Sequence, residues 1–193
     1  MKKTFLYESK KNCCACNACA QKCPRQAITM TIDQAGYQYP TIDPSRCISC
    51  NLCKKVCNYQ NGTIETSQKI TFVSQAANVD LTQSASGGVF ASIAKEVLKD
   101  GGIVFGAEMV QDSHVVRHTY ITNENELSRL LGSKYVQSDI NYSYAKAEEF
   151  LKSQKIVLFS GTPCQISRRA RASRTACPRR TSRSCRIYRA LRR

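Results

Sequence analysis

The sequence predicts an α+β protein in which a small cysteine-rich module precedes part of an α/β domain. Two runs of four cysteines with identical spacing lie within the first sixty residues. From about residue 67 the chain alternates helix-like and strand-like patterns, which is typical of an α/β layer architecture. From residue 168 the composition changes abruptly. We therefore expect a module at 1–66, a domain fragment at 67–167 and a tail at 168–193.

The cysteine runs form an internal repeat. Each has the spacing C-x2-C-x2-C-x3-C, and the second run follows the first after 34 positions. Three thiolates two residues apart can wrap one face of an iron–sulfur cube, while the fourth cysteine points toward a second cluster, as in two-cluster bacterial ferredoxins. Two 4Fe-4S clusters are therefore expected. Their ligands would be Cys13, Cys16, Cys19 and Cys57 for one cluster and Cys23, Cys47, Cys50 and Cys53 for the other.

A pair of zinc sites is the alternative for these cysteines. Zinc needs four ligands per site, usually as two separated pairs, whereas each run here is a complete set of four. Cys14 falls outside the repeat and is expected to be a spare thiol. Between the runs, two alternating segments flank the turn signal at residues 33–36, which predicts a β-hairpin.

Helix and strand patterns then follow one another. Ser86-Gly87-Gly88 opens an amphipathic helix that ends near Asp100. Asn123 and Glu126 form a capping-box-like start for a second helix, which Gly132 should end. The other expected elements are strands at 103–107, 115–121 and 156–159 and a helix at 144–152.

The last strand runs into the segment Ser160-Gly161-Thr162-Pro163-Cys164-Gln165. Thr162 can cap a helix and Pro163 suits its first turn, so the amides here could meet a phosphate or another anion. A thiol at Cys164 would have a lowered pKa and be redox-active, or pack under a cofactor. An ordinary turn with a buried cysteine is an equal alternative, just as Gly87 and Gly88 could simply permit close packing. His114 and His118 lack ligand-like neighbours and are expected to be surface or packed residues.

Taken together, in order and spacing, these motifs resemble the coenzyme F-420 hydrogenase/dehydrogenase beta-subunit family over about residues 8–167. The resemblance implies an iron–sulfur flavoprotein oxidoreductase, in which a flavin such as FAD exchanges hydride with the deazaflavin coenzyme or another partner. It assigns no catalytic residue. The residues that it places near the flavin are Ser86, Gly87, Gly88, Gly132, Ser133, Lys134, Tyr135, Gly161, Thr162, Pro163, Cys164 and Gln165.

Two functions stay open. The first is an oxidoreductase that relays electrons between the clusters and a flavin- or deazaflavin-type partner. The second is a non-enzymatic ferredoxin-like electron carrier, or a docking subunit of a larger redox complex. Recognisable sequence stops near Ser167, whereas members of the family often continue further, so flavin binding is left undecided between the two.

The formal net charge of +15 lies mostly in the tail. Eleven of the 29 basic residues fall within 168–193, which contains no acidic residue; the remaining 18 face 14 acidic residues, a net of +4. A slipped reading frame, a solvated basic tail and a nucleic-acid arm are the three explanations, of which we favour the first and consider the last the weakest.

The chain lacks an apolar run approaching the roughly 18 residues that a membrane span needs, and its start does not resemble an export signal. We therefore expect a cytoplasmic protein whose cysteines stay reduced and bind metal. Its expected partner is a redox protein or a flavin-type coenzyme.

Overall fold

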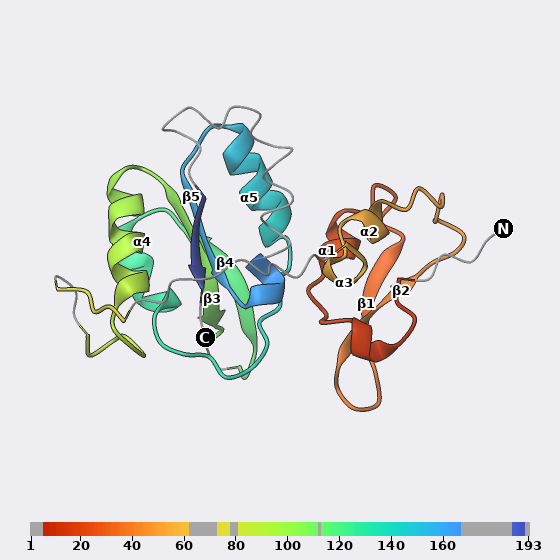
Figure 1. Cartoon of the computed structure of the whole chain (residues 1–193), viewed down its shortest axis with the longest axis horizontal. Helices are drawn as coiled ribbons and strands as arrows, with labels where there is room; N and C mark the ends of the chain where they lie inside the picture. Colours follow the sequence, from red (N-terminus) through yellow and green to blue (C-terminus); the bar gives the residue numbers. More distant parts are fainter. Residues whose placement is uncertain (1–5, 62–72, 78–80, 112, 167–186, 192–193) are drawn as a thin grey trace.

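A computed structural model describes residues 6–61, 73–77, 81–111, 113–166 and 187–191. Two parts lie side by side (Figure 1). The N-terminal part is a β-hairpin with short helices, and the second part is a mixed sheet with a helix on each face. The α+β class agrees with the prediction.

The N-terminal part contains the predicted hairpin. β1 (Ile28–Ile32) and β2 (Gln38–Ile42) pair in antiparallel register. The carboxylate of Asp33 fixes the turn because it accepts a hydrogen bond from the backbone N–H of Tyr37 at 3.0 Å. Gly36 has a φ of +83°, a conformation that residues with a side chain rarely adopt.

Short helices follow the cysteine loops at two equivalent places. α1 (Ala18–Gln21) begins after Asn17, and α2 (Leu52–Lys55) begins after Asn51. Both asparagines are left-handed, with φ of 58° and 57°, a conformation that Asn tolerates better than most residues. The matched asparagines of the repeat therefore correspond to a matched backbone. The remaining short elements are η1 (Lys10–Asn12) and α3 (Asn58–Asn61).

The second part is a four-stranded mixed sheet with the order β4-β3-β5-β6. β3 pairs antiparallel with β4 and parallel with β5, and β5 pairs parallel with β6. β3 and β5 begin with runs of buried apolar residues, as expected of strands that are covered on both faces. The strands are β3 (Ile103–Met109), β4 (Val116–Ile121), β5 (Val157–Gly161) and β6 (Ile187–Leu191).

Helices cover both faces of the sheet (Figure 1). α4 (Val89–Lys99) lies on one face and α5 (Ser143–Lys152) on the other. Successive residues of a strand point to opposite faces. Val104 is accordingly buried in the apolar cluster that includes α4, whereas Phe105 is buried in the cluster that includes α5.

The segment after β4 is a 3-10 helix, η2 (Glu124–Leu130). Asn123 caps it as predicted, because its side-chain oxygen accepts a hydrogen bond from the backbone N–H of Glu126 at 3.2 Å. The Glu126 carboxylate accepts a hydrogen bond from the side-chain amide of Asn123 at 2.8 Å. In a true capping box this carboxylate would accept from the backbone N–H of Asn123 instead. Gly132 follows the helix with a φ of +75°.

Most of the predicted tail at 168–193 lies outside the described residues. Its described part, residues 187–191, forms β6 at the edge of the sheet next to β5. The three explanations for the tail stay predictions. Within the part of the chain that the structure describes, no helix combines the length and the apolar character required to cross a membrane.

Candidate metal centres

The structure divides the eight repeat cysteines between two hollows, whose volumes include the space open to solvent. The first cysteine hollow, of about 450 Å³, is lined by Cys13, Cys16, Cys19 and Cys57. The second cysteine hollow, of about 350 Å³, is lined by Cys23, Cys47, Cys50 and Cys53. In each hollow the fourth cysteine comes from the other run, which is the grouping expected from the repeat.

Left-handed residues between the cysteines shape both loops. Ala15 and Asn17 in the first loop have φ of 52° and 58°, and Ser49 and Asn51 at the equivalent places in the second have φ of 55° and 57°. Each such residue reverses the local course of the backbone. Three cysteines close in sequence can therefore line one hollow.

Burial penalises the ionised form of several of these thiols. Desolvation raises the pKa of Cys13 and of Cys53, and it raises the pKa of Cys19 to about 12. Iron binds thiolates, so the charge of bound iron would offset this cost. The backbone N–H of Ala27 also donates to the sulfur of Cys23 at 3.3 Å, and hydrogen bonds to ligand sulfurs tune cluster potentials.

The thiols border the hollows without meeting at one point. A zinc ion holds its sulfur ligands about 2.3 Å from a single centre. Over the described ranges, no three His, Cys, Asp or Glu side chains converge in a way that could hold one metal ion. Four cysteines that line one hollow agree in number and kind with the four thiolates that hold a 4Fe-4S cluster.

The loop that lines the first cysteine hollow packs against the α/β part. The side-chain amide of Gln137 donates to the backbone carbonyls of Cys14 and Ala15, at 3.0 and 3.4 Å. Ala18 and Val56 from the N-terminal part are buried in the same apolar cluster as β3, β5 and α5. The loop that carries three of the four cysteines is therefore fixed directly to the second part of the molecule.

Two cysteines outside the expected ligand sets belong to the segments on either side of this contact. Cys14 borders the first hollow, and Cys164 lies just beyond β5. The Cys164 sulfur lies 3.1 Å from the hydroxyl of Thr162. Hydrogen bonding from Cys14 lowers the pKa of Cys164, while the contacts with Cys16 and Cys164 raise the pKa of Cys14.

A buried polar network holds the turn that carries Cys164. His118 is 4% exposed; its Nε2 lies 2.9 Å from the Ser160 carbonyl, which can only accept, so Nδ1 accepts from the Ser138 hydroxyl at 2.7 Å. The Gln165 amide donates to the Ser138 hydroxyl at 3.1 Å. Its oxygen accepts from the backbone N–H of Thr162 at 2.9 Å. Of the two roles left open for His118, surface or packed, the structure shows the packed one, whereas Ser138 has no signal in the sequence.

Acidification is expected to destabilise the protein through His118. Burial lowers the pKa of this imidazole below its ordinary value of 6.5, so the unfolded chain binds a proton more readily than the folded one. The contribution to stability is complete above about pH 6.5 and is lost as the pH falls from there toward the folded-state pKa. Thermal unfolding followed by circular dichroism should show a smaller fall in midpoint for His118→Gln than for the parent chain, between about pH 7.5 and about pH 5.5.

The exposed His114 provides the matched control for this comparison. His114→Gln makes the same substitution at an exposed position and measures its effect outside the core. Identical pH dependence in the parent chain and His118→Gln would contradict the role given to the buried imidazole.

The three segments expected near a flavin lie at the end of the sheet where the C-terminal ends of β3 and β5 are found. Residues 161–165 leave β5 there, and the Gln165–Ser138 hydrogen bond brings the segment after residue 132 to the same place. Ser86–Gly88 lead into α4, which begins at this end of the sheet on the opposite face from α5 (Figure 1).

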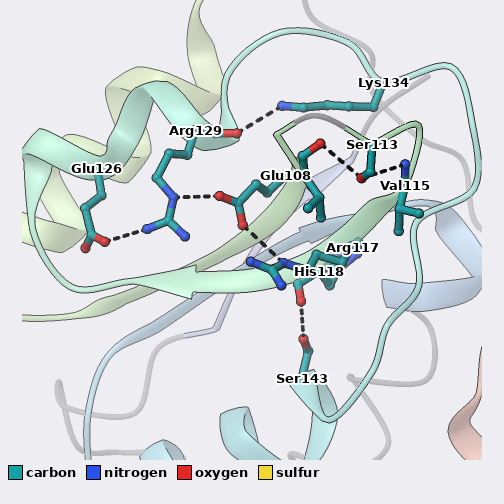
Figure 2. A network of polar contacts seen from close by, with 10 residues as sticks. Glu108, Ser113, Val115, Arg117, His118, Glu126, Arg129, Lys134 and Ser143 are labelled. Atoms are coloured by element: carbon teal, nitrogen blue, oxygen red, sulfur yellow. Dashed lines mark hydrogen bonds and ion pairs between the residues drawn. The ribbon is translucent and has the colours of Figure 1, made fainter.

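Lys134 and Gly87 both make contacts with the backbone of the protein. The Lys134 ammonium donates to the carbonyl of Arg129 at 3.3 Å (Figure 2). It also donates to the carbonyl of Leu131, at the end of η2, at 2.5 Å. A Cβ on Gly87 would lie 2.5 Å from the carbonyl oxygen of Ser74, so this glycine permits a close backbone approach. The Lys134 ammonium, which was expected to suit a phosphate, therefore binds backbone carbonyls. The contact at Gly87 agrees with the alternative that this glycine permits close packing.

Comparison with known families identifies the N-terminal part. Residues 12–61 match the family model of the 4Fe-4S dicluster domain. No curated protein matches the chain. The matched segment contains both cysteine runs, and this part is accordingly a ferredoxin-like iron–sulfur module with a role in electron transfer.

Proposed function

We propose that the protein is an iron–sulfur oxidoreductase that relays electrons between two 4Fe-4S clusters and a flavin- or deazaflavin-type partner at its α/β part. The observation that carries the proposal is the pair of cysteine hollows within the matched segment, because the loop that lines the first of them packs against the α/β part.

Each cysteine hollow would hold one cluster through its four thiolates. A bound cluster supplies one-electron redox chemistry. The left-handed loop residues orient the thiols, and the Ala27 N–H stabilises negative charge on Cys23. Apolar side chains reduce the contact of the first hollow with water, since Leu6, Met30 and Pro40 line it. Low solvent access is one of the properties that set a cluster potential.

The second cysteine hollow offers a route for a redox partner protein. Cys50 is exposed, and the neighbouring Ile48 is 60% exposed. The first hollow instead meets the α/β part through the loop that includes Cys14. Electrons would therefore pass between a partner protein and the second hollow, and between the first hollow and the α/β part.

FAD would bind beyond the C-terminal ends of β3 and β5. Ligands of open α/β sheets usually bind beyond the carboxyl ends of the strands. The resemblance to the coenzyme F-420 hydrogenase/dehydrogenase beta-subunit family supports this placement. The segments at 86–88, 132–135 and 161–165 would contribute to the site.

A non-enzymatic electron carrier or docking subunit is the second candidate, because two expected phosphate donors are already engaged. The Lys134 ammonium donates to backbone carbonyls, and the Thr162 N–H donates to Gln165. In this conformation neither group fits a phosphate-binding role. The N-terminal module would then carry electrons, and the α/β part would dock it to a larger assembly.

Iron, sulfide and flavin per chain, measured on anaerobically purified protein of confirmed intact mass, test the proposal. Two 4Fe-4S clusters correspond to about eight iron and about eight sulfide ions per chain. Flavin released on denaturation would support the oxidoreductase. Full iron content with no flavin after reconstitution would support the electron carrier, and a colourless protein with zinc but no iron would contradict both.

A further inference from the structure

We propose that an acidic one-electron carrier protein docks on the basic rim of the second cysteine hollow. This basic rim consists of Lys22, Arg25 and Arg46, all of which are exposed. Arg25 lines the hollow, and Lys22 and Arg46 each directly precede a cysteine that lines it. The inference rests on the proposed function, in which this hollow holds a cluster, and it adds the charge of the partner and the residues that attract it.

The positive charge of residues 1–167 is concentrated on the N-terminal module. Residues 6–61 contain seven basic and three acidic residues, a net of +4. Residues 73–166 contain eight basic and ten acidic residues, a net of −2. A negatively charged protein would therefore be steered toward the module in preference to this stretch of the α/β part.

Several charges of the α/β part offset one another in ion pairs. Glu108 pairs with Arg117 at 3.5 Å and with Arg129 at 2.7 Å, and Arg129 also pairs with Glu126 (Figure 2). Opposite charges this close cancel at a distance, so they contribute little to the attraction of a charged protein.

The basic rim keeps most of its charge. Neither Lys22 nor Arg25 forms an ion pair with any residue that the structure describes. Asp43 lies three residues before Arg46 and offsets part of its charge. The Asp43 carboxylate itself accepts hydrogen bonds from the backbone N–H and the hydroxyl of Ser45, at 2.9 and 2.6 Å. At least two positive charges of the rim are therefore directed to solvent.

The surface next to the basic rim suits a protein better than a nucleic acid. Ile48, which is 60% exposed, lines the hollow together with the exposed Pro24 and Cys50. Protein interfaces combine apolar contacts of this kind with a polar rim, whereas nucleic acids are bound mainly through their phosphates. An acidic protein could bury Ile48 and pair with the basic rim at the same time.

The second cysteine hollow is also accessible to such a partner. The apolar cluster that joins the two parts of the molecule includes Ala18 and Val56 of the module, and neither residue lines this hollow. Docking here would serve the exchange of a single electron. The carrier is oxidised and the cluster in the second hollow is reduced by one electron, or the reverse, and no bond changes and no proton moves.

Binding of a small acidic 2Fe-2S ferredoxin to the iron-loaded full chain tests the inference. Both proteins are kept oxidised, so that calorimetric titration measures affinity without electron transfer. Titrations at ionic strengths of about 20 mM and about 200 mM should show binding that weakens with salt, because salt screens exposed charges. A basic c-type cytochrome should not bind. Absence of ferredoxin binding at low salt, or equal binding of the cytochrome, would overturn the proposal.

Charge reversal locates the docking surface. Lys22→Glu/Arg25→Glu should weaken ferredoxin binding about tenfold or more, because like charges would then face each other. Lys99→Glu/Lys155→Glu is the matched control, since it makes the same change in net charge at two exposed lysines of the α/β part and should leave the affinity unchanged. Residues 168–193 are identical in both variants and contribute equally. Equal weakening in the two variants would overturn the proposal.

Two further measurements separate the remaining outcomes. A short DNA duplex that lost affinity for Lys22→Glu/Arg25→Glu by the same factor as the ferredoxin would overturn the choice of a protein partner. Iron is measured on every sample. Weakened docking with full iron supports the inference, whereas loss of iron from this variant would overturn it, because the charges would then serve the cluster. Iron missing from the parent chain would contradict the proposed function and this inference together.

Discussion

Cys13→Ser/Cys57→Ser is expected to retain about half of the iron and sulfide, because both substitutions fall on the first cysteine hollow and leave the second hollow complete. Cys47→Ser/Cys57→Ser removes one ligand from each hollow and is expected to retain clearly less than half. The two variants lose the same number of cysteines, so the difference between them reports only how the ligands are grouped. Iron and sulfide assays on anaerobic protein measure it.

If Cys47→Ser/Cys57→Ser retained more iron than Cys13→Ser/Cys57→Ser, the interleaved grouping of the cysteines would be contradicted. If each run of four cysteines held its own cluster, Cys47→Ser/Cys57→Ser would be the variant that keeps half of the iron. Cys14→Ser is the control for a cysteine in the same loop that lies outside the ligand sets, and it should keep the full iron content.

The placement of three cysteines on each loop can be predicted from sequence because it depends on local geometry, whereas the fourth ligand, from the other run, follows from the two-cluster ferredoxin pattern. Within each loop a few backbone conformations set the cysteine positions, and Asn17 and Asn51 mark where the left-handed residues fall. The hairpin is predictable for the same reason, since Asp33 and Gly36 specify its turn. Buried apolar runs likewise reveal β3 and β5 to within a few residues.

Contacts between distant segments cannot be predicted in this way. No spacing pairs Gln137 with the loop of Cys14, because their contact depends on how the module packs against the α/β part. Ser138 is a similar case: it becomes important only because His118 and Gln165 approach it from two other segments.

Local rules also leave a choice among hydrogen-bond partners. The long side chain of Lys134 can reach a ligand or nearby carbonyls, and in the structure it meets the free carbonyls at the end of η2. Glu126 likewise bonds the side chain of Asn123. The same residue type is compatible with both outcomes, so the sequence predicts the segment and the packed structure decides the contact.

Phe159→Ala is expected to lower the free energy of unfolding by about 3–5 kcal/mol, the usual cost of removing a buried phenylalanine ring. The side chain is 1% exposed. Its ring stacks on Phe105 and on His118, with centroid distances of 5.3 and 5.4 Å. Alanine would leave a cavity between β5 and α5, which the surrounding side chains could fill only in part.

Tyr135→Ala is the aromatic control, because this ring is 95% exposed and its loss should change stability by no more than about 0.5 kcal/mol. Urea unfolding followed by circular dichroism compares the two variants. Phe159 shares its apolar cluster with Ala18 and Val56, so the cavity should also loosen the attachment of the first cysteine loop. Equal stability of the two variants would show that this cluster does not hold the module and the α/β part together.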